Sequence, residues 1–201
     1  MTQIAIIDYG LGNLRSVMKG LEKAGAHAAI TCDEHEIAAA DGLVLPGVGA
    51  FHEGMEQIGP LKGLIIESTR DVPLLGICLG MQMLMETSEE HGLHRGFGLV
   101  PGRVTRFPRV PGFKVPHMGW NSLAIEQPDN PLLAGLGPEE YVYFVHSYYA
   151  DTLPEYTLTS TQYITPFASA VRNGNAYGVQ FHPEKSGAVG LRMLENFIGM
   201  I

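Results

Sequence analysis

The first half of the chain alternates between short apolar runs and amphipathic segments. Apolar residues between positions 14 and 21 recur at helical spacing, which places them on one face of a helix that Gly25 ends. Short buried strands that alternate with such helices are typical of a parallel sheet covered on both faces. The predicted strands are residues 3–8, 42–45 (ended by Pro46 and Gly47) and 73–77. The predicted helices are the one that carries Leu14, Val17, Met18 and Leu21, and residues 60–69 and 79–88.

The second half is richer in strand patterns joined by turns. A stretch rich in Gly and Pro (97–127) comes first, and a closing helix is expected from about Val189. The turn at 172–175 contains Asn-Gly, which is typical of a β-hairpin. We therefore expect a single α/β domain over residues 1–201, with a mostly parallel, partly mixed central sheet flanked by helices. The strand-like segments are residues 141–149, 157–162, 167–172 and 176–181.

Composition and charge narrow the classes of function. The chain has 201 residues, of which 45% are hydrophobic and 17% charged, which suits a globular domain and not a disordered segment. Its formal net charge of −8 disfavours nucleic acid as a partner, because a negative surface repels phosphates. The N-terminus lacks a signal-peptide pattern and no apolar run is long enough for a membrane span, so we expect a cytoplasmic protein that does not bind membranes. Only Cys32 and Cys78 are present, so no disulfide framework is expected.

One cysteine lies between two glycines at a predicted strand-to-helix junction. Residues 76–80 read Gly-Ile-Cys-Leu-Gly, the spacing of a nucleophile elbow with Cys78 at its centre. The glycines remove β-carbons that would clash in so sharp a turn, and the helix start behind Cys78 favours a thiolate. The Leu79 amide would then face the substrate oxygen as part of an oxyanion hole. A buried structural cysteine in a tight turn is an equally good reading of this motif alone.

The second chemical motif follows the last predicted strand. Pro183 stops strand pairing, so the polar side chains of His182 and Glu184 are expected at a strand end. A histidine there can take the proton of a thiol on a neighbouring strand end, while the glutamate fixes its tautomer and stabilises its charged form. Alone, this motif is more often a solvated surface turn. Together with the cysteine turn upstream, it favours a catalytic triad of Cys78, His182 and Glu184.

With these two motifs, GICLGMQ (76–82) and QFHPEKS (180–186), the chain resembles the class I (triad) glutamine amidotransferases over essentially its whole length. The resemblance implies that the triad hydrolyses the side-chain amide of glutamine. LPGVGAF (45–51) is similar to the oxyanion loop of that family, which implies that the backbone around Gly47 and Val48 completes the oxyanion hole with Leu79. Glycines suit this task because they let backbone N–H groups approach a ligand, although an ordinary strand-ending turn would look similar.

Further motifs resemble one subfamily, the glutaminase subunits of imidazole glycerol phosphate synthase in histidine biosynthesis. They are IDYGLGNL (7–14), PHMGWN (116–121), YFVHSYY (143–149) and Lys185. The chain ends just after its last expected helix, so we expect a separate partner to consume the ammonia, and the resemblance implies a (β/α)8-barrel cyclase in a heterodimer. By position, the resemblance implies a glutamine pocket formed by Gly49, Gln82, His146, Ser147 and Tyr148. It implies a partner interface at Asn13, Trp120, Tyr143 and Lys185.

Alternatives remain for the residues and for the function. Trp120 and Tyr143 could be core aromatic residues, and Gln82 an exposed helix residue. The chain could be the glutaminase of another synthase, for anthranilate, GMP or pyridoxal phosphate, a cysteine peptidase, or a non-catalytic subunit that binds a partner. The eight histidines show no metal-ligand spacing, so neither a metal nor a cofactor is expected.

Overall fold

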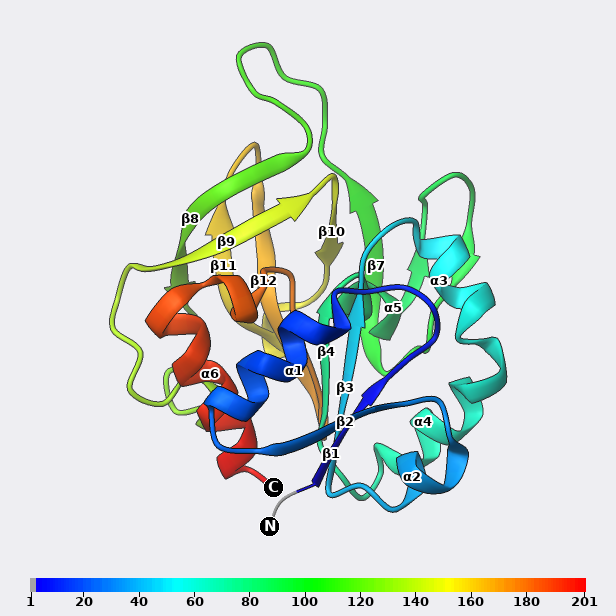
Figure 1. The fold of residues 1–201 in the computed structure, drawn as a ribbon. Helices are drawn as coiled ribbons and strands as arrows, with labels where there is room; N and C mark the ends of the chain where they lie inside the picture. Colours follow the sequence, from blue (N-terminus) through cyan, green and yellow to red (C-terminus); the bar gives the residue numbers. More distant parts are fainter. Residues whose placement is uncertain (1–2) are drawn as a thin grey trace.

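A computed structural model of the chain describes residues 3–201 (Figure 1). The strands are β1 (Gln3–Ile7), β2 (His27–Thr31), β3 (Gly42–Gly47), β4 (Leu74–Cys78), β5 (Met85–Ser88), β6 (His94–Arg95), β7 (Val100–Arg106), β8 (His117–Ile125), β9 (Glu140–His146), β10 (Tyr148–Asp151), β11 (Thr157–Gln162), β12 (Pro166–Asn173) and β13 (Ala176–Val179). The α-helices are α1 (Leu14–Lys23), α2 (Glu34–Ala38), α3 (Phe51–Gln57), α4 (Lys62–Ser68), α5 (Leu79–Leu84) and α6 (Gly187–Gly199). Short 3-10 helices are η1 (Gly59–Leu61), η2 (Pro131–Leu133), η3 (Pro154–Tyr156) and η4 (Pro183–Lys185).

The strands form one mixed sheet with a parallel half and a mainly antiparallel half. Its order is β2-β1-β3-β4-β13-β12-β10-β7-β5-β6, and the strands from β2 to β13 run parallel to one another. The hairpin of β12 and β13 begins the antiparallel half, through the predicted turn at Gly174. β11 pairs with β12 and carries the antiparallel pair β8–β9. The predicted fold class is confirmed.

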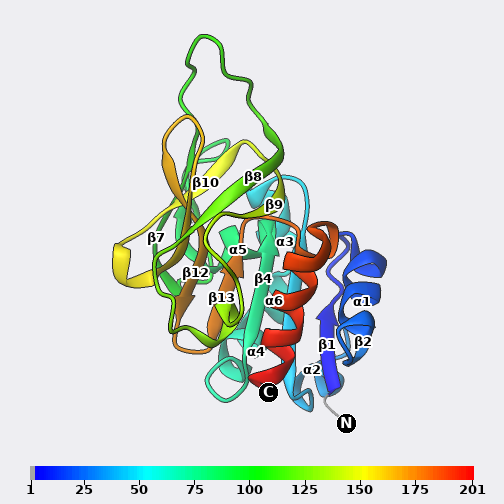
Figure 2. The same ribbon diagram turned by 90° about the vertical axis from the view of Figure 1, so that its left-hand side faces the viewer.

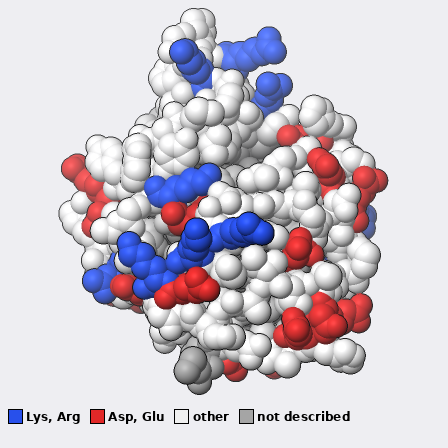
Figure 3. All heavy atoms as spheres, viewed as in Figure 1, with Lys and Arg blue, Asp and Glu red and all other residues white. Residues whose placement is uncertain are grey.

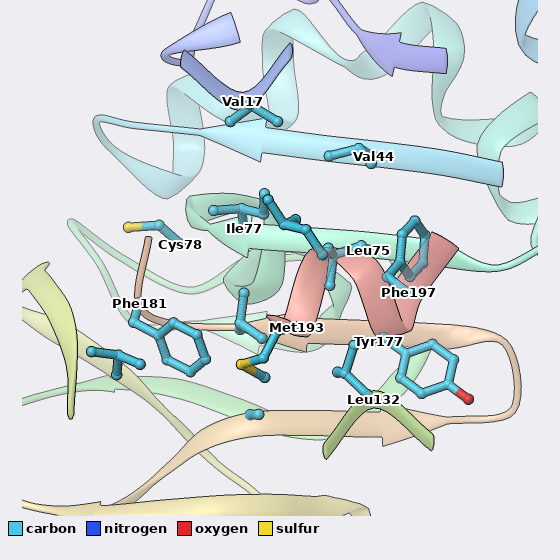
Figure 4. Packing of buried hydrophobic residues seen from close by; sticks show 14 of the residues in the cluster. Val17, Val44, Leu75, Ile77, Cys78, Leu132, Tyr177, Phe181, Met193 and Phe197 are labelled. Carbon is cyan, nitrogen blue, oxygen red and sulfur yellow. The ribbon is translucent and has the colours of Figure 1, made fainter. Parts of the chain in front are cut away.

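Helices cover both faces of the parallel half (Figures 1 and 2). Side chains alternate along each strand, so Ile4 and Ile6 of β1 pack with α1 and α6 on one face, while Ala5 and Ile7 pack with α2 to α5 on the other. In the first cluster, Val17 of α1 and Phe197 of α6 lie close to the strands that lead to Cys78 (Figure 4). The nucleophile turn is therefore supported by packed layers on both sides.

Several predicted elements are confirmed and others need correction. The amphipathic helix is α1, with Gly25 in the left-handed conformation just beyond its end. Helix α5 stops at Leu84, because residues 85–88 pair with β7 as strand β5, so the predicted helix 79–88 was too long. Strand β3 includes Pro46 and Gly47, which pair with β4, so the strand ends two residues later than predicted. The predicted strand 141–149 is two strands interrupted at Ser147. Residues 27–31, 34–38 and 51–57 form elements that the pattern did not predict.

The molecule is unevenly charged. On the face shown in Figure 3, Asp and Glu side chains gather over α2 to α4, while Lys and Arg side chains lie over α1 and on a projecting loop. That loop joins β7 to β8, and it carries Arg109 and Lys114. The net charge of −8 therefore does not describe each face of the molecule.

Candidate active site

Cys78 lies where β4 ends and α5 begins. Its backbone has φ 55° and ψ −108°, outside the regions that most residues adopt, as expected for a strained nucleophile turn. The glycines around it are required by close backbone contacts. A β-carbon on Gly76 would lie 2.7 Å from the Gly80 carbonyl oxygen, and one on Gly80 would overlap the Leu45 carbonyl oxygen. The turn can therefore form only with glycine at both flanking positions.

Gly80→Ala is expected to destabilise the protein by more than about 3 kcal/mol, because the added methyl group has no space beside β3. The matched control is Gly63→Ala on α4, where a β-carbon meets nothing within 4 Å. The control should stabilise the protein by roughly 0.5–1 kcal/mol, as alanine is the better helix former. Urea unfolding of both variants measures the difference, and equal stabilities would contradict this account of the turn.

The loop at 47–49 lies directly beside the nucleophile. Gly47 is the register partner of Cys78 in the β3–β4 pair. The buried Tyr9 hydroxyl donates to the Pro46 carbonyl at 2.8 Å and fixes the base of the loop. Gly49 has φ 101°, which favours glycine, and Val48 is 42% exposed. The amide at the start of α5, on Leu79, and the backbone of this adjacent loop are therefore the candidate oxyanion donors.

His182 and Glu184 are brought together behind Cys78. His182 Nδ1 lies 2.9 Å from Glu184 Oε1, and both side chains are almost fully buried. Within residues 3–201, His182 Nε2 and Glu184 Oε2 have no hydrogen-bond partner. Strand β13 ends at Val179, so these residues follow the strand by a short segment, and Pro183 begins η4. The geometry leaves the second imidazole nitrogen free for proton transfer.

The charge state of His182 is set by opposing effects. Burial disfavours the imidazolium, but the neighbouring Cys78 sulfur and the hydrogen-bonded Glu184 carboxylate outweigh this effect and raise the pKa of His182 to about 9. At neutral pH the imidazole therefore holds a proton beside the sulfur. Such a proton both stabilises a thiolate and is available for a leaving group.

A cavity of about 420 Å³ opens beside this cluster. It is large enough for an amino acid, and Cys78 and His182 line it. Gly47 and Glu184 are not among its lining residues, since Gly47 packs against Leu79 and Tyr9, and Glu184 lies behind the imidazole. The other predicted site residues that line the cavity are Val48, Gly49, Leu79, Gln82, His146, Ser147 and Tyr148.

The polar side chains of the pocket are held by hydrogen bonds. Gln82 is buried, not exposed, and its Nε2 donates to the Tyr148 carbonyl at 3.0 Å and to Gln180 Oε1 at 3.1 Å. Both of its N–H groups are thus occupied, which leaves its Oε1 as an acceptor for a ligand. His146 bonds the same Tyr148 carbonyl through Nδ1 at 2.8 Å, and burial lowers the pKa of His146 to about 3. His146 is therefore an uncharged residue that lines the pocket.

Sequence reasoning missed three lining residues, Glu90, Pro116 and Val145. Glu90 is the important one, because it brings a carboxylate into the cavity wall. Its Oε2 accepts from the Phe51 amide at 2.7 Å, which links it to the start of α3 and the 47–49 loop. A carboxylate suits the ammonium group of an amino acid. The acidic pair that follows Ser88 was a usable signal, but the incorrect helix over 79–88 obscured it.

The residues expected at a partner interface lie outside the cavity. Trp120 of β8 is 56% exposed and packs edge-on against Tyr143 of β9, with ring centroids 6.1 Å apart. Asn13, at the start of α1, and Lys185, in η4, are exposed. Trp120 is therefore a surface residue and not a core residue, and Tyr143 is half-buried beside it.

A larger hollow lies elsewhere on the molecule. It has a volume of about 960 Å³ and is lined by Lys62, Arg95 and Arg103 among others, without a cysteine or a histidine. Within residues 3–201, no group of three or more His, Cys, Asp or Glu side chains is arranged to hold a metal ion. Across the same residues, no helix has the length and apolar character needed to cross a membrane. The cavity beside Cys78 is the one that combines a nucleophile with a base.

A family model and several named relatives match the chain over nearly its whole length. The model of the family Glutamine amidotransferase class-I matches residues 5–200. The imidazole glycerol phosphate synthase subunit HisH of Methanosarcina barkeri is 55% identical, with 100% of both chains covered. The subunit of the same name from Archaeoglobus fulgidus is 49% identical over 98% of each chain.

Solved structures share the fold at lower identity. A putative GMP synthase subunit from Thermoplasma acidophilum has a TM-score of 0.76 and 24% identity, and the match covers 100% of this chain and 94% of that one. The glutaminase domain of a Trypanosoma brucei CTPS, solved with bound acivicin, has a TM-score of 0.69 and 17% identity over 98% and 94% of the two chains. At these identities the comparison concerns the fold alone.

Proposed function

The chain belongs to the class-I glutamine amidotransferase family, and we propose that it is the glutaminase subunit of an imidazole glycerol phosphate synthase in histidine biosynthesis. In this role it hydrolyses L-glutamine to glutamate and ammonia. The observation that carries the proposal is that Cys78 and His182 line an amino-acid-sized cavity, with Glu184 bonded to the imidazole behind it. The relatives named above support the choice of synthase, because about half of their residues are identical over the full chain.

The proposed reaction begins with glutamine in the cavity. Its side-chain carbonyl lies between the Leu79 amide and the backbone at Gly47 and Val48, while its ammonium group faces Glu90. The Cys78 thiolate attacks the amide carbon, and the oxygen takes up the negative charge in front of the backbone donors. Each such donor contributes on the order of 100–1,000-fold in rate.

The second half of the reaction uses the imidazole. His182 gives its proton to the departing nitrogen, so the carbon–nitrogen bond breaks and ammonia leaves a γ-glutamyl thioester on Cys78. His182 then takes a proton from water, which attacks the thioester and releases glutamate and the thiolate. Glu184 holds the imidazole in the required orientation at 2.9 Å throughout.

A subunit of a synthase requires a partner to use the ammonia. We propose a heterodimer with a (β/α)8-barrel cyclase, which contacts Asn13, Trp120, Tyr143 and Lys185. The His182 amide donates to the Tyr143 carbonyl at 3.0 Å, so a partner bound to this face would contact the strand, β9, that is hydrogen-bonded to the base. We place the complex in the cytoplasm, where the free thiols would stay reduced.

Glutamate release, with and without the cyclase and its phosphorylated ribulosyl-aminoimidazole nucleotide, tests this function. We expect weak activity alone and about 100-fold stimulation by the loaded partner, the value of one oxyanion donor gained when the glycine-rich loop turns. Trp120→Ala should require roughly 30-fold more cyclase for the same stimulation, as expected for a central aromatic contact. Full activity of the isolated chain would refute the coupling. Stimulation by an anthranilate or GMP synthase chain instead would refute the choice of partner.

A further inference from the structure

Gln180 is a buried amide next to the nucleophile that the proposed reaction does not use. Its side chain is 0% exposed, and it lies between β13 and His182. Its Nε2 lies 3.7 Å from Cys78 Sγ, a hydrogen-bonding distance for sulfur, and its Oε1 accepts from Gln82. A fully buried amide is retained only if its polar atoms are paired, so both contacts are part of how this site is built.

The direction of the Gln180 amide is fixed by its neighbours. The Tyr148 carbonyl can only accept, so Gln82 must turn its NH2 group toward it, at 3.0 Å. The second N–H of that group then needs an acceptor, so Gln180 must present its Oε1. Reversing either amide would place two donors or two acceptors against each other. The Gln180 NH2 group is thereby forced toward the sulfur.

The Tyr148 carbonyl is itself held in place by a chain of neutral imidazoles. His146 Nδ1 lies 2.8 Å from this carbonyl and must donate to it, so His146 Nε2 is an acceptor for His117 Nδ1 at 3.0 Å. His117 Nε2 then accepts from Asn121 Nδ2 at 3.3 Å. Burial lowers the pKa values of both histidines, to about 4 for His117 and about 3 for His146, which agrees with neutral rings. A continuous chain of hydrogen bonds, each with a defined donor, therefore runs from Asn121 of β8 through His117 and His146 to the Tyr148 carbonyl.

Two contacts of the sulfur act in opposite directions. The Val145 carbonyl, 4.0 Å from Cys78 Sγ, can accept only from the protonated thiol. The Gln180 amide, as a donor, interacts best with the thiolate. We propose that Gln180 is a positioning residue, whose amide N–H donates to Cys78 Sγ, favours the thiolate and fixes its direction of attack. This inference rests on the proposed role of Cys78 as nucleophile.

The test measures how fast iodoacetamide alkylates Cys78 at different pH values. The experiment uses a Cys32→Ser background, because Cys32 is an exposed free thiol that would also react. Gln180→Met keeps length and flexibility but removes the donor. We expect the pH midpoint of alkylation to rise by about one unit, and the rate at pH values below both midpoints to fall by about 10-fold, the size of one hydrogen bond to a charged group. An unchanged alkylation curve would overturn the proposal.

Ser169→Ala is the matched control for loss of a buried hydrogen bond. Ser169 is fully buried, its hydroxyl bonds Thr159 at 2.9 Å, and its carbonyl accepts the Gln180 backbone amide, so the variant loosens the same strands without touching the sulfur. The control should lower the melting temperature and leave the alkylation curve in place. If the control shifts the curve as much as Gln180→Met does, the proposal is wrong.

Two further measurements keep the result interpretable. If Gln180→Met does not fold, Gln180→Glu keeps the acceptor for Gln82 and exchanges the donor for an oxygen, and an upward shift of more than one unit is expected, because the carboxylate also repels the thiolate. An unshifted curve in that variant also overturns the proposal.

Glutamate release by the parent complex separates the positioning role of Gln180 from the proposed function of the protein. An active parent with an unshifted variant refutes only the positioning role, whereas an inactive parent refutes the proposed function itself.

Discussion

Replacing Cys78 with alanine is expected to reduce glutamate release by on the order of a million-fold, to the background rate. The sulfur supplies the bond that carries the acyl group, and no other described residue that lines the cavity has a thiol. Loss of a nucleophile that acts together with its base commonly has an effect of this size. Glutamate release by the complex, measured with an excess of the cyclase, gives the result.

The control for this variant is the stability and assembly of the protein. Cys78 is small and packs in the apolar cluster with Ile77 and Phe181, so alanine should change the melting temperature little and leave binding of the cyclase intact (Figure 4). An assembled Cys78→Ala complex that still releases glutamate would remove the nucleophile assignment. A parent that releases none would favour a non-catalytic binding subunit.

Glu184→Gln is expected to lower kcat by roughly 100- to 10,000-fold with a smaller effect on KM. The buried carboxylate at 2.9 Å orients the imidazole and stabilises its charge, whereas an amide of the same shape supplies no charge. Its loss should move the pKa of His182 down from about 9. Steady-state kinetics and the pH dependence of kcat measure both effects, and a variant with the parent's pH profile would contradict the role of Glu184.

The same variant should change how stability depends on pH. Because the pKa of His182 is raised from 6.5 to about 9 in the folded protein, protonation of His182 stabilises the fold fully below about pH 6.5, and this stabilisation is lost as the pH rises through about 9. In Glu184→Gln, unfolding experiments between these pH values should show a flatter decline. An equally steep decline would mean that the carboxylate does not stabilise the imidazolium.

The residues on which these predictions rest come from the ends of neighbouring strands, β3, β4 and β13. Cys78 and the 47–49 loop come from adjacent parallel strands, whose carboxyl ends meet at one edge of the sheet. His182 follows β13, the next strand across, so the base also reaches that edge. Residues far apart in the sequence are brought together by strand order alone. The catalytic geometry is therefore a direct consequence of the parallel half of the fold.

The sequence by itself determined the features that depend on near neighbours in the chain. The spacing of apolar residues defined α1, and Asn-Gly defined the hairpin turn at Gly174, because helix faces and tight turns are local properties. The glycines around Cys78 predicted its strained turn, and the clash that Gly76 avoids, with the Gly80 carbonyl, is a local one, whereas the clash that Gly80 avoids is with Leu45 of the neighbouring strand β3. The motifs around Cys78 and His182 also suffice to predict the triad, because each is a short continuous segment.

Only the tertiary structure decided features that depend on distant partners. Residues 85–88 have a helical pattern but form β5, because β7 offers them a ladder of hydrogen bonds. Residues 141–149 divide at Ser147, because one part pairs with β8 and the other with β7. The direction of the Gln180 amide depends on Gln82 and Tyr148, which no local pattern connects to it. Strand partners and buried hydrogen bonds are chosen across the folded chain, so their identity is absent from any single segment of sequence.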